Sequence, residues 1–362
     1  MSVKCGIIGL PNVGKSSLFN ALTKSIVPSK NFPFCTIKPN VKSVTIFDDR
    51  LYKISKIVQP NIITPSHIEF VDIAGLVKGA SKGYGLGNKF LSDISQTNVL
   101  IHVVRCFENE KIVHVNNKVD PVSDIKVIND ELIISDIILC EKHLYILKNK
   151  LNKLKNDKIL NKIILLEKIL KNLNNNNLLK NLEMTSEEKK KISDINFLTL
   201  KPMIYVANVS EKKEENVSLK EIKNISKKEK TKIIKLCINL AKNLSVHFKE
   251  KKVFVKKLNI NTDALHFLTT LSYKLLNLET FFTAGKKEVR SWSINKNTKA
   301  IYAAKKIHSD FMKGFIRVNV ISYKDFIKYN GYQKCKNFGK LRSEGKNYIF
   351  KDGDIVNFLF KV

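Results

Sequence analysis

The sequence lacks the features of disulfide-rich, zinc-binding and membrane-spanning proteins. Its 362 residues contain six cysteines, none of them in a Cys-x-x-Cys pair, which argues against both a zinc site and a disulfide framework. No apolar run approaches the roughly 18 residues of a membrane-spanning helix. The N-terminal residues also lack the basic and then apolar pattern of a signal peptide. These absences predict a cytoplasmic protein with reduced thiols and no membrane partner.

Arginine is scarce although the chain is strongly basic. The net charge is +31, from 64 lysines and arginines against 33 acidic residues, and only five of the 64 are arginine. Such an excess favours a polyanionic partner, because lysine neutralises phosphates and releases their counterions. Compositional drift is the alternative, since the chain is crowded with Lys, Asn and Ile and arginine is the usual residue for bidentate phosphate recognition. Charge alone therefore does not establish a nucleic-acid partner.

Four short apolar runs predict the strands of one sheet. They have no polar alternation and helical patterns lie between them, which is typical of buried parallel strands in a doubly wound α/β domain. The runs span 3–10, 68–73, 99–104 and 202–209.

Two further regions have patterns of their own. From about Asp124 to Ser193 glycine and proline are rare and apolar residues recur at helical spacing, with a polar break at 174–177 and a Thr-Ser-Glu-Glu helix start at Thr185. This pattern predicts a helical hairpin, coiled-coil in character, inserted into the α/β domain. Residues 278–362 alternate strand-like runs with turn signals and predict a compact β-rich domain.

A phosphate-binding loop follows the first apolar run. Residues 9–16 read GLPNVGKS and match G-x-x-x-x-G-K-[ST], between a buried strand and an amphipathic helix start. The glycines let backbone N–H groups cradle phosphate oxygens, Lys15 would neutralise the β- and γ-phosphates, and the Ser16 hydroxyl would bind Mg²⁺. The residues expected to line the nucleotide are Asn12, Val13, Gly14, Lys15, Ser16 and Ser17.

Two later segments complete a nucleotide site of this type. Asp72 and Gly75, in the sequence DIAG, end the second apolar run; the Asp can hold Mg²⁺ through water and the Gly N–H can approach the γ-phosphate. Between them and the phosphate loop, the proline-containing loop 31–40 carries Thr36, which would offer Mg²⁺ a second hydroxyl when the triphosphate is present. The alternatives are an ordinary strand-to-loop turn for DIAG and a local cap for Thr36.

The sequence resembles the YchF/Obg-like ATPase family of translation-associated P-loop proteins. The resemblance rests on GLPNVGKSSLFNALT, NFPFCTIKPN, DIAGLVKGASKGYGLGNKFL and HVVRCFEN, while LLNLETFFTAGKKEVRSW and GKNYIFKDGDIVNFLF resemble that family's TGS domain. It implies an Obg-type P-loop nucleotide-binding domain over 1–123 and 197–277, a helical coiled-coil insertion over 124–196 and a β-grasp TGS domain over 278–362. It also implies the ribosome as partner, and we expect a monomer.

The sequence after the fourth apolar run bears on the choice of base. A guanine-specific site uses Asn-Lys-x-Asp, whose Asp accepts from guanine N1–H and the 2-amino group. Here Asn208 remains, Val209 replaces the Lys, and the longer Glu211 replaces the Asp, so the reason to prefer GTP is lost. The resemblance likewise implies ATP over GTP. Alternatively, Asn208 only begins a turn and the base is read elsewhere.

No glutamine is available to orient the attacking water after DIAG, because the next residue is Leu76. In members of the resembled family a histidine matching His114 has been proposed for this role. By itself a histidine between two valines is more often a strand residue than a catalytic group. In relatives that share Pro-Asn-x-Gly-Lys, an Asn matching Asn12 can help to bind K⁺. Lys15 would remain the main source of charge stabilisation, so slow turnover is expected.

These features predict a Mg²⁺-dependent, ribosome-associated ATPase that regulates translation. Basic faces of the helical insertion and the TGS domain are the expected ribosome contacts, and Trp292 and Phe315 are either RNA-stacking or core residues. Two alternatives are a ribosome-assembly GTPase and a ribosome-binding module whose nucleotide site is only structural.

Overall fold

The protein folds into two compact units. The computed structural model describes residues 3–24, 40–75, 86–109, 112–114, 118–153, 156–212, 217–239 and 262–361. The first unit comprises Met1–Val44 and Glu69–Leu268, and the second comprises Thr45–Ile68 and Thr269–Val362. None of the described helices is long and apolar enough to cross a membrane.

The first unit contains a six-stranded sheet in the order β2-β4-β1-β5-β6-β7. Strand β1 lies parallel to β4 and β5, β5 to β6, and β6 to β7. Every residue of β5 and β6 is buried, as the unbroken apolar runs predicted. The strands are β1 (Lys4–Ile8), β2 (Val41–Thr45), β4 (His67–Asp72), β5 (Val99–Arg105), β6 (Met203–Asn208) and β7 (Lys232–Leu236).

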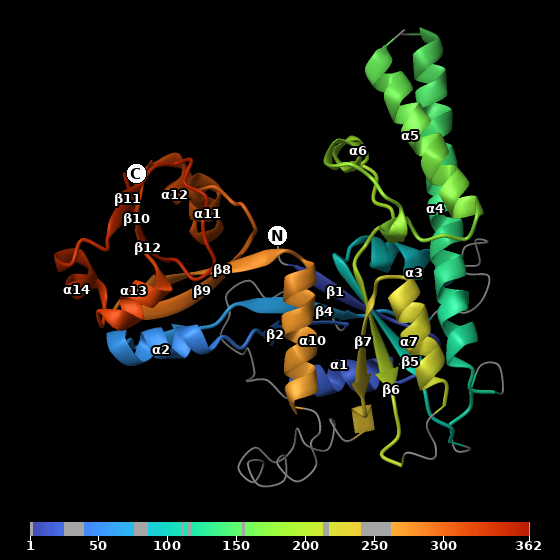
Figure 1. Ribbon diagram of the computed structural model, residues 1–362, viewed down its shortest axis with the longest axis horizontal. Coiled ribbons are helices and arrows are strands. Elements are labelled where there is room, and N and C mark those ends of the chain that lie inside the picture. Colours follow the sequence, from blue (N-terminus) through green and yellow to red (C-terminus); the bar gives the residue numbers. More distant parts are fainter. Residues whose placement is uncertain are drawn as a thin grey trace. The chain divides into compact units, whose positions relative to one another are not determined.

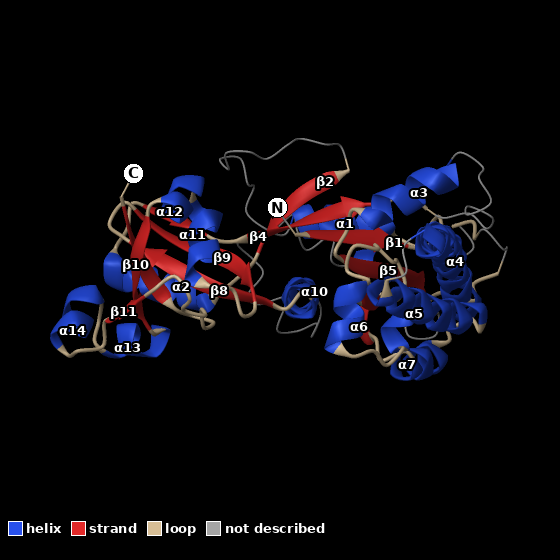
Figure 2. Cartoon of the chain, turned by 90° about the horizontal axis from the view of Figure 1, so that it is seen from above, coloured by secondary structure: helices blue, strands red, loops and turns tan. Residues whose placement is uncertain are grey.

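Helices cover this sheet, as in a doubly wound domain (Figure 2). Helix α1 packs on β1, α4 on β5 and α7 on β7. The helices outside the hairpin are α1 (Lys15–Lys24), α3 (Leu86–Ser95), α7 (Leu219–Lys228) and α10 (Thr262–Leu275), which leads into the second unit.

A helical hairpin is present, and its arms are α4 (Pro121–Lys153) and α5 (Asp157–Asn174), which lie side by side in Figure 1. The arms differ from the predicted ones, because the polar break at 174–177 follows α5 and the two helices meet instead between Lys153 and Asp157. Cys140, Leu144, Leu166 and Ile169 belong to the apolar cluster between them. The chain returns through η2 (Leu179–Asn181) and α6 (Ser186–Lys191), where Thr185 and Glu188 form the reciprocal capping box that the sequence predicted.

A buried carboxylate fixes the returning chain to α4. Asp136 is fully buried and accepts hydrogen bonds from the backbone N–H groups of Leu198 and Thr199, both at 2.8 Å, and from the Thr199 hydroxyl at 2.6 Å. Burial raises the pKa of Asp136 to about 6, although these three donors favour the carboxylate. The hairpin is therefore anchored immediately before β6.

The second unit contains a second six-stranded sheet, in the order β11-β10-β12-β8-β9-β3. Its strands are β3 (Ile62–Thr64), β8 (Leu278–Ala284), β9 (Glu288–Asn295), β10 (Phe315–Ile321), β11 (Arg342–Glu344) and β12 (Ile355–Phe360). Its helices are α2 (Asp49–Val58), α11 (Ala300–Ile307), α12 (Ser309–Lys313), α13 (Tyr323–Lys328) and α14 (Tyr332–Asn337).

Two apolar clusters lie on opposite faces of this sheet, since neighbouring strand residues such as Phe281 and Phe282 belong to different clusters. The first includes alanines of α11, and Trp292 and Phe315 pack against it. Both aromatic rings are therefore partly buried against the core. The second cluster includes residues of α2, α13 and α14.

Residues 45–68 differ from the predicted division, which placed them in the nucleotide-binding domain. Leu51 and Ile54 of α2 pack in one cluster with Phe282 and Phe326, and β3 extends the second sheet by pairing with β9. Residues 45–68 join the second unit because the apolar side chains of α2 are buried in the core of that unit. The sequence did not indicate which core they would join.

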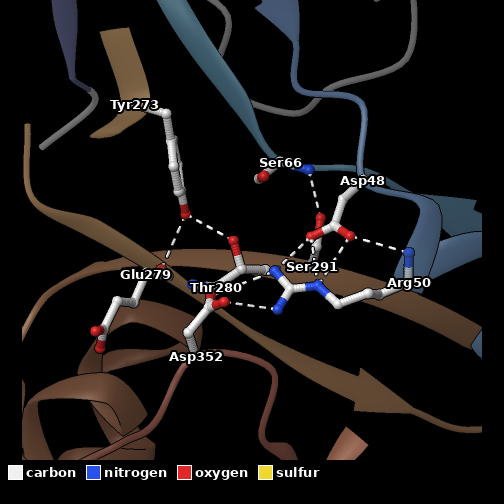
Figure 3. Close-up of polar contacts among 8 residues, drawn as sticks. All are labelled: Asp48, Arg50, Ser66, Tyr273, Glu279, Thr280, Ser291 and Asp352. Carbon is white, nitrogen blue, oxygen red and sulfur yellow. Dashed lines mark hydrogen bonds and ion pairs between the residues drawn. The ribbon is translucent and has the colours of Figure 1, made fainter. Parts of the chain in front are cut away.

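An arginine links this inserted segment to the rest of the second unit (Figure 3). The Arg50 guanidinium donates to both carboxylate oxygens of Asp48 and, at 2.7 Å, to Asp352. Asp352 in turn accepts from the backbone N–H of Thr280 at 2.9 Å. Nearby, the backbone N–H of Ser66 donates to the Ser291 hydroxyl at 2.6 Å.

Arg50→Lys is expected to destabilise the second unit by about 1–3 kcal/mol, because an ammonium group cannot replace the forked contacts with two carboxylates. Thermal or urea unfolding would measure this. Arg317→Lys, at an exposed position on β10, is the matched control and should change stability little. Equal stabilities of the two variants would contradict the assigned role of Arg50.

Candidate functional site

The predicted nucleotide residues meet at the carboxyl ends of neighbouring parallel strands. Ile7 near the end of β1 pairs with Asp72 at the end of β4, and Arg105 at the end of β5 pairs with Asn208 at the end of β6. Ligand sites of α/β sheets lie at this edge.

The phosphate loop needs its glycines for both conformation and space. Gly9 and Gly14 have φ angles of 148° and 104°, which residues other than glycine rarely adopt. A Cβ on Gly9 would lie 2.5 Å from the Val103 carbonyl oxygen, and one on Gly14 would lie 2.7 Å from Nδ2 of Asn208. The loop is therefore packed tightly against the ends of β5 and β6.

Lys15 lies at the start of α1 and is buried. Its Nζ donates to the Leu10 carbonyl oxygen at 2.6 Å, within the phosphate loop. Burial lowers the pKa of Lys15 to about 8, while the nearby Asp72 carboxylate raises it. A bound polyphosphate would add negative charge next to this buried ammonium group and so stabilise its charged form.

The DIAG segment approaches this lysine. A Cβ built on Gly75 would lie 3.0 Å from Nζ of Lys15 and 3.1 Å from the backbone nitrogen of Pro11. A side chain at this position would have little room, because the backbone after Asp72 lies against the phosphate loop. Leu76 and Thr36 lie outside the described residues.

A cavity of about 280 Å³ opens over the phosphate loop. Its lining residues are Asn12, Gly14, Lys15, Ser16, Ser17, Phe107, Ile112, Asn208, Ile238 and Asn239. Val13 is buried behind the loop. The motif predicted the polar side of this cavity, whereas nothing in the sequence singled out Phe107, Ile112, Ile238 and Asn239.

Asn208 fixes the loop to the sheet. Its Nδ2 donates to the Val13 carbonyl oxygen at 2.9 Å, and its Oδ1 accepts from the backbone N–H of Ile238 at 3.3 Å. The side chain therefore connects the phosphate loop to the chain that follows β7. The contacts among the described residues use one of the two N–H groups of this amide.

Val209 and Glu211 do not line the cavity. The Val209 side chain is buried and its backbone N–H donates to the Leu236 carbonyl oxygen, whereas Glu211 is exposed. Of the three residues predicted to read the base, only Asn208 lies at the cavity.

His114 is buried against the start of α4 instead of lining the cavity. Its Nε2 lies 3.0 Å from Oδ2 of Asp124 in the first turn of that helix. Burial raises the pKa of Asp124, while the hydrogen bond with His114 lowers it. Asn12 extends toward the same loop, since its Nδ2 donates to the Val113 carbonyl oxygen at 3.2 Å.

Arg105 shapes one wall of the cavity, a role that the sequence analysis missed. Its buried guanidinium donates to the carbonyl oxygens of Phe107, Asn109 and Ile112 at 3.0–3.1 Å. These bonds fold the loop that carries Phe107 and Ile112 into the cavity lining. An arginine at the end of a mostly apolar strand was the available signal, because a buried guanidinium must find several acceptors.

The oxygen donors at the site fit Mg²⁺. The exposed Ser16 lines the cavity, and the Asp72 carboxylate lies at the end of the strand next to β1. The described residues hold no cluster of three or more histidine, cysteine or acidic side chains that would bind a metal by itself. This is the arrangement expected where Mg²⁺ takes most of its ligands from phosphates and water.

Comparisons with known proteins agree with this site. A family model described as a 50S ribosome-binding GTPase matches residues 4–142, and the YchF-GTPase C-terminal model, described as a protein of unknown function, matches residues 278–361. The ribosome-binding ATPases YchF of Buchnera aphidicola (subsp. Schizaphis graminum) and Escherichia coli O157:H7 are 51% and 48% identical to this chain, and each alignment covers both chains completely.

A solved structure agrees as well. The Schizosaccharomyces pombe YchF GTPase matches with a TM-score of 0.89 at 35% identity, over 99% of this chain and 98% of that one. The chain therefore belongs to the YchF family. The P-loop fold, the helical hairpin and the resemblance seen in the sequence are thereby confirmed.

Asn208→Asp is expected to weaken nucleotide binding about tenfold or more. The change is nearly isosteric, but it replaces the donor to the Val13 carbonyl oxygen with a carboxylate oxygen and so loosens the loop. Titration calorimetry would measure the affinity. Asn224→Asp, at an exposed position of α7, is the control and should bind as the parent does. Unchanged affinity of Asn208→Asp would show that this contact does not hold the loop.

Proposed function

We propose that this chain is a ribosome-associated ATPase that acts as a translation-associated regulatory factor. The observation that supports this best is the juxtaposition of Lys15, Ser16 and Gly75 at the phosphate loop, beside a cavity. Relatives that match over their whole length are named ribosome-binding ATPases. We also propose that it acts as a monomer in the cytoplasm.

Each residue of the site has an assigned part. Lys15 exchanges the Leu10 carbonyl oxygen for the β- and γ-phosphates, and the Gly75 N–H contacts the γ-phosphate. Ser16 and Thr36 would hold Mg²⁺ through their hydroxyls, and Asp72 would hold it through water. The ion supplies charge neutralisation when it is bound. Asn12 is assigned to K⁺, as an additional ion.

Water activation is assigned to His114, which must first leave Asp124. In the described arrangement the imidazole is engaged with this carboxylate and buried. A histidine released by movement of the loop before α4 would be able to orient water. This requirement is consistent with slow turnover in the absence of a partner.

We propose that the site binds ATP in preference to GTP. Adenine would lie near Phe107, Ile112 and Ile238, with the second N–H of Asn208 available to its ring nitrogen. Among the described residues that line the cavity there is no carboxylate to accept from guanine N1–H. The rival, a ribosome-assembly GTPase, predicts the opposite preference, and a structural nucleotide site predicts negligible turnover.

Lys15→Ala is expected to weaken ATP binding at least tenfold, because the motif places no other cation at the β- and γ-phosphates. Titration calorimetry with ATP and with GTP would measure the affinity and the base preference together. Lys53→Ala, on the exposed face of α2, is the control. A Lys15→Ala variant with the parent's ATP affinity would remove the phosphate-loop assignment.

Binding to ribosomes should weaken steeply as salt rises, because lysine–phosphate contacts release counterions. Co-sedimentation of the full chain with ribosomes over a KCl series would measure the slope. Replacing the exposed lysines Lys189, Lys190 and Lys191 of α6 with Gln should reduce it if the helical insertion contacts RNA. A parent protein that fails to sediment at the lowest salt would contradict ribosome association itself.

A further inference from the structure

A stacked aromatic pair lies in the second unit, with the half-buried Tyr329 at the end of α13 and the exposed Phe338 at the end of α14. The rings of Tyr329 and Phe338 stack with centroids 4.9 Å apart and planes at 27°. Phe338 is 63% exposed, the highest exposure of any phenylalanine in the described part of the chain. Because one face of the Phe338 ring covers Tyr329, its other face is open to solvent.

The backbone holds this ring in place. Gly339 ends α14 with a φ of 65°, the Gly339 N–H donates to the Lys336 carbonyl oxygen, and the Lys340 N–H donates to that of Cys335. This pair of bonds is a Schellman cap, which fixes the residue before the glycine. The buried Cys335 anchors the helix in the apolar cluster beneath it. A Cβ built on Gly339 would meet no atom within 4 Å outside its chain neighbours, so the chain after the ring is not packed against other parts of the described structure.

The segment that carries the ring is rich in exposed lysines. Residues 323–340 contain five lysines and one acidic residue, Asp325, whose carboxylate already accepts from the Ser322 hydroxyl at 2.7 Å. All five lysines are exposed: Lys324, Lys328, Lys334, Lys336 and Lys340. Lys328 lies over the Tyr329 ring at 5.4 Å. Helices α13 and α14, which carry all of these lysines except Lys340, lie next to each other in both views (Figures 1 and 2).

We infer that this surface, residues 323–340, binds unpaired RNA, with one base stacked on the open face of Phe338 and the lysines on neighbouring phosphates. An immobilised aromatic face within a field of cations is the arrangement that takes single-stranded nucleic acid, whereas base faces in a duplex are covered. An acidic protein would use the lysines but would gain little from a bare ring. The inference deepens the proposed function by assigning the RNA contact to a surface other than Trp292 and Phe315.

The test uses the full chain and a short fluorescent single-stranded RNA, with binding followed by anisotropy. Phe338→Ala should weaken binding about tenfold, while Phe338→Tyr, which keeps the ring, should bind as the parent does. Tyr302→Ala is the control, since Tyr302 is an exposed aromatic on α11, at the opposite face of the sheet. The parent should prefer the single strand over a duplex of equal length, and Phe338→Ala should lose that preference.

Charge is tested separately. Replacing Lys334, Lys336 and Lys340 with Gln should lower the slope of log affinity against log salt by about two, if each contacts one phosphate. The same charge change at Lys220, Lys223 and Lys227 of α7 is the control and should leave the slope unchanged. Thermal unfolding verifies that each variant is folded.

Three results would overturn the inference. The first is equal RNA affinity of Phe338→Ala and the parent, and the second is an equal loss in Tyr302→Ala. The third is a Phe338→Ala variant that loses ribosome binding but keeps RNA affinity, since the surface would then contact a protein. Failure of the proposed function is distinct, because the parent itself would then not sediment with ribosomes.

Discussion

The nucleotide site depends on the close fit of the phosphate loop against the ends of β5 and β6. Gly9 leaves no space for a side chain beside the Val103 carbonyl oxygen, and Gly14 leaves none beside the Asn208 amide. Asn208 then bonds the loop to the chain that follows β7. Lys15 and Ser16 are thereby held at the cavity by buried strands. An ordinary glycine-rich turn would need none of these constraints.

In the proposed function, nucleotide hydrolysis depends less on the groups that are already in position than on the side chains that must change partners. The phosphate loop is positioned, and Arg105 holds one wall of the cavity through three carbonyl oxygens. The Lys15 ammonium is engaged with the Leu10 carbonyl oxygen and the His114 imidazole with Asp124. In the proposed function, both side chains exchange these partners before they act on a triphosphate, and slow turnover in the absence of a partner follows from that proposal.

The sequence predicted the elements whose constraints are local. Apolar runs identified β1, β5 and β6, the glycine pattern identified the phosphate loop, and the capping box at Thr185 identified α6. It did not predict that 45–68 joins the second unit, because the apolar face of α2 would suit either core. Nor did it separate Asn208 from Val209 and Glu211, since exposure to the cavity depends on how β6 and β7 end. Phe107 and Ile238 were missed because an apolar cavity wall looks like core in a sequence.

The central claim is that this site hydrolyses ATP and that the protein acts in association with the ribosome. The most direct measurement is the affinity and turnover of ATP and GTP, with Mg²⁺ and K⁺ present, in the absence and presence of ribosomes. The account predicts tighter binding of ATP than of GTP and slow ATP turnover that ribosomes accelerate. Negligible turnover of both nucleotides with ribosomes present, or a preference for GTP, would contradict it.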